Sequence, residues 1–247
     1  MAARGFALVT GAARRIGRAL ALAAAETGFD FLAHTRGAPP PDAHETKNLI
    51  EAAGHHCELV SGDLADPIAC ARLFSPRTQP VSLLVNSASL FDDDRLDTLT
   101  PEGFDAHMAT NLRAPILLAQ AFAVQAPAGA LIVNILDQRV WRPTPQYFSY
   151  AISKAALWQA TVMMAQALAP KIRANGIGPG PTLASVHQRP EDFEAEAAGV
   201  PLGRRVTPQE VGEALKYLID ATSVTGQMIA VDGGQHLAWR TPDIIEP

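Results

Sequence analysis

A tyrosine and a lysine four positions apart, Tyr150 and Lys154, are the residues of this sequence best suited to proton transfer. On an α-helix, residues i and i+4 lie on one face, so the phenol and the ammonium can point into the same cleft. A nearby ammonium favours the phenolate, so we expect Lys154 to lower the pKa of Tyr150 from its usual value of about 10. The phenol would then exchange a proton near neutral pH. Because such pairs also occur on solvated helix surfaces, the rest of the chain must support this interpretation.

Short apolar segments alternate with helical ones along the chain, and Tyr150 and Lys154 lie on the helix after the fifth apolar segment. The alternation predicts a doubly wound parallel sheet. We expect one Rossmann-like α/β domain over residues 1–247, with a seven-stranded parallel sheet flanked by helices. The predicted strands are residues 5–10, 29–35, 57–61, 81–85, 131–136, 172–177 and 227–231, and the predicted helices include 14–27, 42–53, 67–74, 101–125 and 208–220.

Composition excludes several classes of protein. The 247 residues carry a net charge of −5 and no basic run longer than Arg14-Arg15, which argues against nucleic-acid binding. No apolar run reaches the roughly 18 residues needed to span a bilayer, and the chain starts without a leader-like segment. Cys57 and Cys70 fit neither a metal spacing nor a disulfide framework. We therefore expect a cytoplasmic protein without a metal, a membrane segment or a nucleic-acid partner.

The first predicted strand runs into the turn Thr10 to Gly17, where Gly11 makes the tight turn and Gly17 lets the helix start close to the sheet. Such a junction offers backbone N–H groups and the positive end of a helix to a pyrophosphate. This predicts a dinucleotide site, although an ordinary strand-to-helix turn has a similar sequence.

The end of the second predicted strand indicates which dinucleotide binds. An acidic residue there would bind a ribose 2′-hydroxyl, but the sequence reads His34-Thr35-Arg36, and Asp30 lies at the opposite end of the strand. A guanidinium can pair bidentately with a 2′-phosphate, and Arg14 could reach the same group from the first turn. NADP is therefore favoured over NAD, unless both arginines are ordinary exposed residues.

These motifs resemble, in order and spacing, those of the short-chain dehydrogenase/reductase family, over nearly the whole length of the chain. The matching motifs are the glycine turn at Gly11–Gly17, Asn86-Ser87-Ala88-Ser89, Asn111, the Tyr150–Lys154 pair, Pro179-Gly180 and the terminal Val231–Gly234.

At three positions the chain departs from the commonest family pattern, and there it resembles the motifs of pteridine reductases and dihydromonapterin reductases. Arg15 replaces the middle glycine of the turn, the usual NNAG reads NSAS at 86–89 and is followed by Phe91, and Asp137 replaces the serine thirteen positions before Tyr150. The phrases HTR at 34–36 and NGIGPGPTL at 175–183 are similar to the same subgroup.

Asp137 has a chemical meaning of its own. A ketone needs a neutral donor beside the tyrosine, and a carboxylate there would repel a developing alkoxide. A pterin instead presents ring nitrogens that need protons, which an aspartate beside a tyrosine can relay. The alternative is that Asp137 only caps the loop after its strand.

The resemblance implies a role for each matching residue. NADPH would lie across the carboxyl ends of the strands, and a pterin would stack between the nicotinamide and Phe91. The implied catalytic residues are Asp137, Tyr150, Lys154 and Asn111, the last at a helix distortion. The implied cofactor-binding residues are Gly11, Arg14, Arg15, Ile16, Gly17, His34, Thr35, Arg36, Asp63, Leu64, Asn86, Ser87, Ala88, Tyr150, Lys154, Pro179 and Gly180. The implied substrate-binding residues are Arg15, Ser89, Phe91, Asp137 and Tyr150.

The resemblance also implies a substrate flap over about 180–208 and a homo-tetramer, or in some members a homo-dimer. Several pteridine reductases place a C-terminal arginine in a neighbouring active site, and Arg240 lies near that position without a fixed register.

The leading hypothesis is an NADPH-dependent reductase that converts dihydropterins to tetrahydropterins, with dihydrofolate reduction as a side activity. The first alternative is a short-chain reductase of a carbonyl or enone, which Asp137 and Arg15 disfavour. The second is a non-catalytic NADP-binding sensor, which has no need to keep Tyr150 and Lys154.

Overall fold

The computed structural model describes residues 4–74, 79–184 and 188–239. Its centre is a seven-stranded parallel sheet, as expected from the sequence, and the strand order is β3-β2-β1-β4-β5-β6-β7. The strands are β1 (Phe6–Val9), β2 (Asp30–Thr35), β3 (Cys57–Ser61), β4 (Val81–Asn86), β5 (Ala130–Ile135), β6 (Ile172–Pro179) and β7 (Met228–Val231). The order reverses between β1 and β4, and ligands of doubly wound sheets bind at that switch point, beyond the carboxyl ends of the strands.

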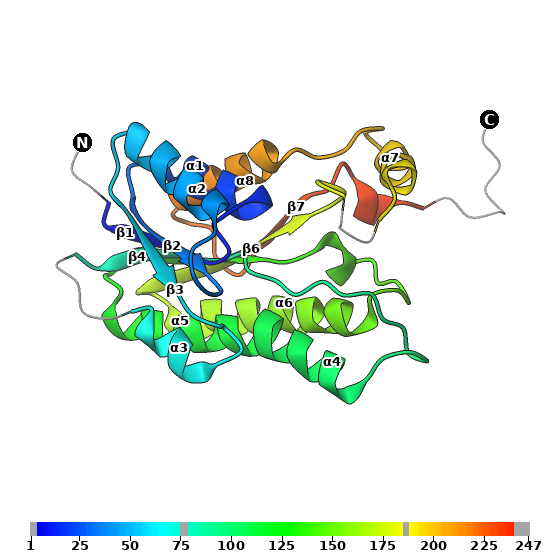
Figure 1. Cartoon of the computed structure of the whole chain (residues 1–247), viewed down its shortest axis with the longest axis horizontal. Helices are drawn as coiled ribbons and strands as arrows, with labels where there is room; N and C mark the ends of the chain where they lie inside the picture. The colour runs from blue at the N-terminus through cyan, green and yellow to red at the C-terminus, as the bar shows by residue number, and fades with distance from the viewer. Residues whose placement is uncertain (1–3, 75–78, 185–187, 240–247) are drawn as a thin grey trace.

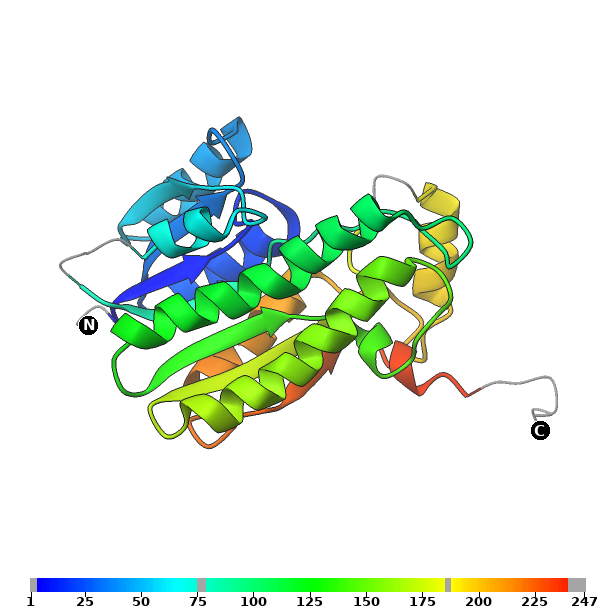
Figure 2. The same ribbon diagram turned by 90° about the horizontal axis from the view of Figure 1, so that it is seen from below.

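Helices cover both faces of the sheet (Figure 1). One layer holds α1 (Arg15–Ala25), α2 (Pro41–Ala52) and α8 (Pro208–Asp220), and the other holds α3 (Pro67–Arg72), α4 (Pro101–His107), α5 (Ala114–Gln125) and α6 (Phe148–Leu168). Seen from below, α5 and α6 run side by side across the sheet (Figure 2). No helix within the described ranges has the length and apolar character to cross a membrane.

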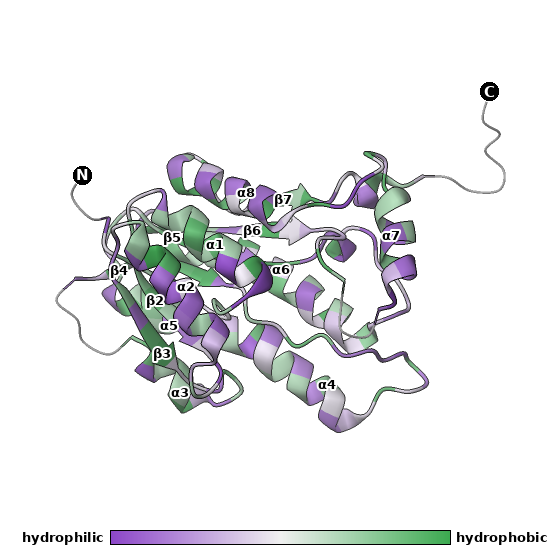
Figure 3. Ribbon diagram, turned by 45° about the horizontal axis from the view of Figure 1, so that its top comes forward, coloured by the Kyte–Doolittle hydropathy of each residue, from purple (hydrophilic) through white to green (hydrophobic). Residues whose placement is uncertain are grey.

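Alternation along β1 explains the two core layers. Ala7 and Val9 face the layer of α1 and α8, whereas Phe6 and Leu8 face the layer of α5 and α6. All four side chains are buried, as expected for a parallel strand covered on both faces. The helices of Figure 3 are mottled with hydrophilic and hydrophobic residues, because each buries only one face.

Several helices start where their sequences predict. Thr100 caps α4 by accepting a hydrogen bond from the Gly103 amide at 3.1 Å, and Thr207 forms a capping box with Glu210 at the start of α8. The helix predicted over 101–125 is present, and a π-helical segment, η1 (Met108–Arg113), joins its α-helical parts α4 and α5. Helix α7 (Pro190–Ala198), inside the predicted flap, was not anticipated as a helix.

Gly17 lets α1 approach the glycine turn that precedes it. A Cβ at this position would lie 2.1 Å from the carbonyl oxygen of Gly11, and a backbone carbonyl cannot move aside as a flexible side chain can. The close approach fixes the start of α1 against the end of β1, where the candidate site begins.

We therefore predict that Gly17→Ala lowers the free energy of unfolding by about 2 kcal/mol, since the added methyl overpacks the turn. Urea unfolding followed by circular dichroism measures this loss. Gly37→Ala is the matched control because a Cβ at Gly37 meets nothing within 4 Å. Equal stability of the two variants would contradict the packing role of Gly17.

Candidate active site

The turn after β1 has the conformation of a phosphate-binding loop. Gly11 and Arg15 both have left-handed backbone, with φ of 68° and 56°. An arginine pays a steric cost there that the glycine usual at this position in the family would avoid. The first turn of α1 contains neither a capping side chain nor an acidic residue, so its amide groups remain available to an anion.

This turn fits the diphosphate of a nucleotide. A Cβ at Gly11 would lie 3.0 Å from Cα of Ala88, so only a glycine lets the loops after β1 and β4 come this close. Arg14 is exposed beside the uncapped helix end. Ile16 and Gly17 pack inward and place the start of α1.

His34, on β2, links the loops after β1 and β3 rather than projecting outward. Its ring is 2% exposed, its Nδ1 lies 3.4 Å from the amide nitrogen of Gly11, and its Nε2 lies 2.9 Å from the carbonyl oxygen of Gly62. Burial lowers the pKa of His34, which keeps Nδ1 free to accept from Gly11. The side chain thus shapes the predicted cofactor site from beneath.

The residues predicted to read the adenosine half lie at the ends of β2 and β3. Arg36 is 83% exposed and its Nε lies 3.3 Å from Oδ2 of Asp63. Asp63 also accepts from the Ala65 amide at 2.9 Å, while Leu64 is buried. The Thr35 hydroxyl donates to the carbonyl of Gly37 at 2.9 Å, so it is engaged within this strand end.

The strand end Asn86-Ser87-Ala88 is tied to its neighbours by buried polar groups. Thr10 Oγ1 accepts from the amides of Ser87 and Ala88 at 2.9 and 3.0 Å. Asn86 donates to Asn134 on β5 at 2.8 Å, and the two residues are paired in register. These bonds align the ends of β4 and β5 beside the residues predicted to be catalytic.

Asp137, Tyr150 and Lys154 meet at the carboxyl end of β5, as the sequence predicts. The Tyr150 hydroxyl donates to Oδ2 of Asp137 at 2.9 Å, and the Arg139 amide donates to Oδ1 at 2.8 Å. Lys154 Nζ donates to the Ile135 carbonyl at 2.7 Å and lies 5.6 Å from the centre of the Tyr150 ring. Asp137 does cap the turn after its strand, but it binds Tyr150 as well.

The expected lowering of the pKa of Tyr150 is wrong for the protein itself. Burial and the neighbouring Asp137 carboxyl, which also accepts a hydrogen bond from the phenol, hold the pKa of Tyr150 well above its usual range. Burial also raises the pKa of Asp137 and lowers the pKa of Lys154 to about 8. Sequence spacing placed Lys154 correctly but could not show that a carboxyl, rather than the ammonium, contacts the phenol.

Asn111 lies in the π-helical segment and links two other elements. Its Nδ2 donates to Leu90 O at 2.9 Å and to Ser153 Oγ at 3.0 Å, while its Oδ1 accepts from Leu90 N at 2.8 Å. Ser153 in turn donates to the Tyr150 carbonyl at 2.7 Å. The predicted helix distortion is therefore present, and it joins the loop after β4 to the helix of Tyr150. Ser89 donates to the same Asn111 oxygen at 3.2 Å.

The start of α6 is fixed by a residue that the sequence motifs do not include, Asp94. Its carbonyl accepts from Phe148 N at 3.1 Å, and its carboxylate accepts from the Ser149 amide at 3.0 Å and from the Ser149 hydroxyl. The loop after β4 thus caps the helix whose first turns carry Tyr150. The sequence gives no local signal for this contact, because Asp94 lies far from residues 148–149 along the chain.

A cavity of about 350 Å³ opens beside Asp137 and is lined by residues from the loops after β4, β5 and β6 and from α7. Its size suits a small organic ligand. Phe91 stacks on Tyr147 with ring centres 4.4 Å apart and meets Tyr150 edge-on at 4.6 Å. The residues that line the cavity are Phe91, Asp137, Gln138, Arg139, Gln146, Tyr147, Pro179, Gly180, Pro181, Thr182, Leu183, Gln188, Phe193, Glu196 and Gln235.

Sequence reasoning missed much of this lining. Four other residues face the same cavity as Phe91 and belong to no recognised motif: Gln138, Arg139, Tyr147 and Glu196. From the glycine turn, Arg15 donates to the carbonyls of Leu183 and Ala184 at 3.2 and 2.9 Å. Arg15 therefore connects the predicted cofactor loop to the segment that borders the cavity.

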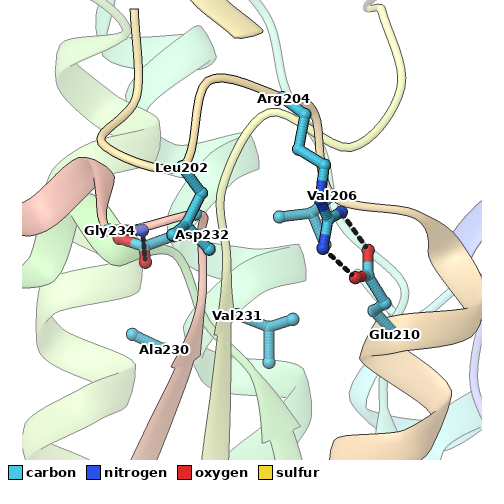
Figure 4. Close-up of a pocket in the computed structure, with 9 residues that line it drawn as sticks. Leu202, Arg204, Val206, Glu210, Ala230, Val231, Asp232 and Gly234 are labelled. Atoms are coloured by element: carbon cyan, nitrogen blue, oxygen red, sulfur yellow. Dashed lines mark hydrogen bonds and ion pairs between the residues drawn. The ribbon is translucent and has the colours of Figure 1, made fainter.

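A second hollow, of about 250 Å³, lies over β7 and the start of α8 (Figure 4). Its charged groups are satisfied within the protein, since both guanidinium Nη atoms of Arg204 bind the Glu210 carboxylate and Asp232 accepts from Gly234 N. This hollow contains none of the predicted catalytic residues. Within the described parts of the chain, no cluster of three or more His, Cys, Asp or Glu side chains could hold a metal ion.

The doubly wound sheet, the glycine turn and the Asp-Tyr-Lys group together define a nucleotide-dependent oxidoreductase. A sequence model of the family described as enoyl-(acyl carrier protein) reductase matches residues 11–236. The chain belongs to the short-chain dehydrogenase/reductase family.

Three relatives are similar over nearly the whole chain. FolM alternative dihydrofolate reductase 1 from Brucella canis, solved in complex with NADP, is 45% identical with a TM-score of 0.92, covering 99% of each chain. The angucycline C-6 ketoreductase LanV with bound NADP is 29% identical with a TM-score of 0.89, covering 96% of this chain and 97% of that one. The L-xylulose reductase of Mesocricetus auratus is 33% identical over 241 residues, covering 92% of this chain and 95% of the relative.

The lowered pKa of Lys154 predicts a pH-dependent stability. Between the folded value of about 8 and the ordinary value of 10.5, the unfolded chain binds more protons at Lys154 than the folded chain does. The free energy of unfolding should therefore increase with pH across this window, by up to about 1.4 kcal/mol per pH unit, and this gain is lost as the pH is lowered to 8.

Urea unfolding from pH 7 to pH 10 tests this, with the wild-type value compared at each pH with that of Lys154→Met. The difference between the two should change with pH only above about 8. A constant difference across the range would contradict the lowered pKa.

Proposed function

We propose that this oxidoreductase reduces pterins, converting dihydropterins to tetrahydropterins with NADPH, and that it reduces dihydrofolate as a side activity. The observation that carries the proposal is the 2.9 Å hydrogen bond between Tyr150 and Asp137 at the wall of a cavity of about 350 Å³. A carboxyl in this place suits ring nitrogens that need protons better than it suits a carbonyl oxygen. The similarity to FolM alternative dihydrofolate reductases supports the same substrate class.

The cofactor is NADP(H), as in the solved relatives that contain NADP or NADPH. The turn at Gly11–Gly17 and the uncapped start of α1 would hold its diphosphate, and Arg14 and Arg36 would pair with the 2′-phosphate. When bound, the cofactor supplies a hydride to a carbon of the substrate ring.

The chain's own residues supply the proton. Tyr150 would donate from its hydroxyl to the nitrogen next to the reduced carbon, and Asp137, whose pKa burial raises, would return a proton to Tyr150. Lys154, anchored on Ile135 O, would hold the nicotinamide ribose near the phenol. Asn111 fixes the backbone of Tyr150 through Ser153.

The cavity would hold the pterin against Phe91. One face of Phe91 is stacked on Tyr147, so the planar substrate would use the opposite face or displace Tyr147. Arg15, which reaches the segment after β6, would contact both the cofactor phosphate and the pyrimidine carbonyl. The segment 180–208, which contains α7 and lines the cavity with Phe193, would act as the flap.

A carbonyl reductase is the second candidate. The L-xylulose reductase and the ketoreductase among the relatives favour it, since the names of both describe carbonyl reduction. Asp137 argues against it, because a carboxylate beside the phenol opposes charge that develops on a carbonyl oxygen.

We also propose a homo-tetramer, or a dimer as its smaller form, in the cytoplasm. Val124 on α5 and Met163 on α6 are 84% and 58% exposed, on the two helices that lie side by side in Figure 2. Exposed large apolar side chains on neighbouring helices favour association with a second copy.

Sedimentation velocity should give an oligomer for the wild-type chain and a smaller species for Met163→Glu, because a buried unpaired charge would weaken that interface by several kcal/mol. Leu49→Glu, at an exposed apolar position on α2, is the control and should sediment as wild type. A monomeric wild-type chain would exclude the assembly.

The decisive test of the substrate follows NADPH absorbance after a dihydropterin is added. Tyr150→Phe should lower kcat/KM by about 10²-fold or more, since it removes the proton donor and leaves the ring in place. Tight NADPH binding without dihydropterin turnover in the wild-type enzyme would overturn the pterin proposal.

Asp137→Ser separates the two candidates. It should reduce dihydropterin turnover and improve the reduction of a ketone panel, because serine is a neutral donor beside the phenol. Ketone reduction by the wild-type enzyme that exceeds its dihydropterin reduction would favour the carbonyl candidate.

A further inference from the structure

Arg139 occupies an unusual position between the catalytic pair and the predicted flap. Its backbone amide donates to Asp137 at 2.8 Å, and its guanidinium lies 5.4 Å from the centre of the Tyr147 ring. The side chain is only 19% exposed, and its Nη1 is buried without a hydrogen-bond partner. A buried guanidinium that is not fully paired exerts a stronger field on its neighbours than an exposed one.

Glu196 of α7 faces this guanidinium across the cavity. The nearest pair of atoms, Nη2 of Arg139 and Oε1 of Glu196, is 4.0 Å apart, at the limit of an ion pair. Two glutamines hold the carboxylate in place, since Gln188 donates to Oε2 at 3.0 Å and Gln235 donates to Oε1 at 2.9 Å. Glu196 is thus placed to offset part of the Arg139 charge without cancelling it.

We propose that Arg139 is a positioning residue whose charge sets the protonation state of the Asp137–Tyr150 pair, and that Glu196 moderates this charge from the flap helix. The inference rests on the proton relay proposed above. Both members of the pair feel the guanidinium: its charge opposes the rise that burial causes in the pKa of Asp137 and in the pKa of Tyr150. The position of α7 would thereby influence the acid at the bottom of the cavity.

Other charged groups among the described residues also lie around the cavity or approach it. Lys154 reaches it from α6, and its ammonium is anchored on Ile135 O. Arg15 approaches the cavity from the glycine turn but donates to carbonyls of 183 and 184. The Asp232–His236 pair after β7 is closed on itself at 2.7 Å, with the His236 ring against Trp141. Within the described residues, Arg139 is therefore a cation near the pair that a substitution can remove without changing Asp137, Tyr150 or Lys154.

The first experiment titrates Asp137 directly, without substrate, by NMR of aspartate labelled with ¹³C at the side-chain carboxyl, with Asp137→Asn to assign the resonance. Arg139→Gln should move the Asp137 midpoint to higher pH by about one unit, because a stabilising cation is lost. The hydrogen bond from the residue-139 amide survives any side-chain change. Glu196→Gln should move the midpoint to lower pH by a smaller amount.

Two further variants separate charge from shape. Arg139→Lys keeps the cation and should titrate close to wild type. Arg142→Gln removes the same charge from a nearby exposed arginine, which donates to Gln235 O at 3.2 Å, and should cause no shift. The inference would be overturned if the Asp137 midpoint of Arg139→Gln equalled that of the wild type, or if Arg139→Lys shifted the midpoint as much as Arg139→Gln does.

The pH profile of kcat/KM for a dihydropterin provides the functional readout, and the limb due to Asp137 should move in the same direction. An NMR shift without any dihydropterin turnover in the wild-type enzyme would uphold the role of Arg139 and reject the pterin proposal. If Arg139→Gln no longer binds NADPH, Glu196→Gln still decides the matter, because its Asp137 midpoint should lie at lower pH than that of the wild type and of Arg139→Lys. Indistinguishable midpoints in Glu196→Gln and Arg139→Lys would reject the inference.

Discussion

The hydrogen bond between Tyr150 and Asp137 is the interaction on which the site depends. It brings two acidic groups and one ammonium together at the wall of the cavity, where Tyr150 is 7% and Lys154 3% exposed and Asp137 is partly buried. Burial opposes the charged form of each group, so the phenol and carboxyl retain their protons more strongly and the ammonium less strongly than in water. Proton transfer among such groups needs little rearrangement, which is the property a relay requires.

Much of the surrounding structure serves to hold these groups in place. Asp94 caps the helix that carries Tyr150, and Asn111 ties the same helix to the loop after β4. The register of β4 with β5 aligns Asn86 with Asn134 and so places the end of β5, where Asp137 follows. Catalytic groups positioned by several separate elements are held more rigidly than groups on one loop.

Two arginines connect the glycine turn and the loop after β5 to the segment that follows β6. Arg15 adopts a left-handed backbone in the glycine turn and reaches the segment after β6, and Arg139 faces the helix α7 that follows this segment. Both contacts join a fixed edge of the sheet to the predicted flap. These two arginines therefore connect the glycine turn and the surroundings of Asp137 to the cavity wall by polar contacts.

The order of elements and the proximity of the residues proposed as catalytic could be predicted from the sequence, because periodicity and short motifs are local signals. The strands, the glycine turn and the group Asp137, Tyr150 and Lys154 were found in this way. The tertiary structure alone decided what lies against them. Arg139, Tyr147 and Glu196 enter the site through packing between distant segments, and no local pattern records such contacts. The pKa of Tyr150 was predicted in the wrong direction for the same reason: spacing identifies a neighbour on the helix, whereas burial and the partner of the hydroxyl depend on the fold.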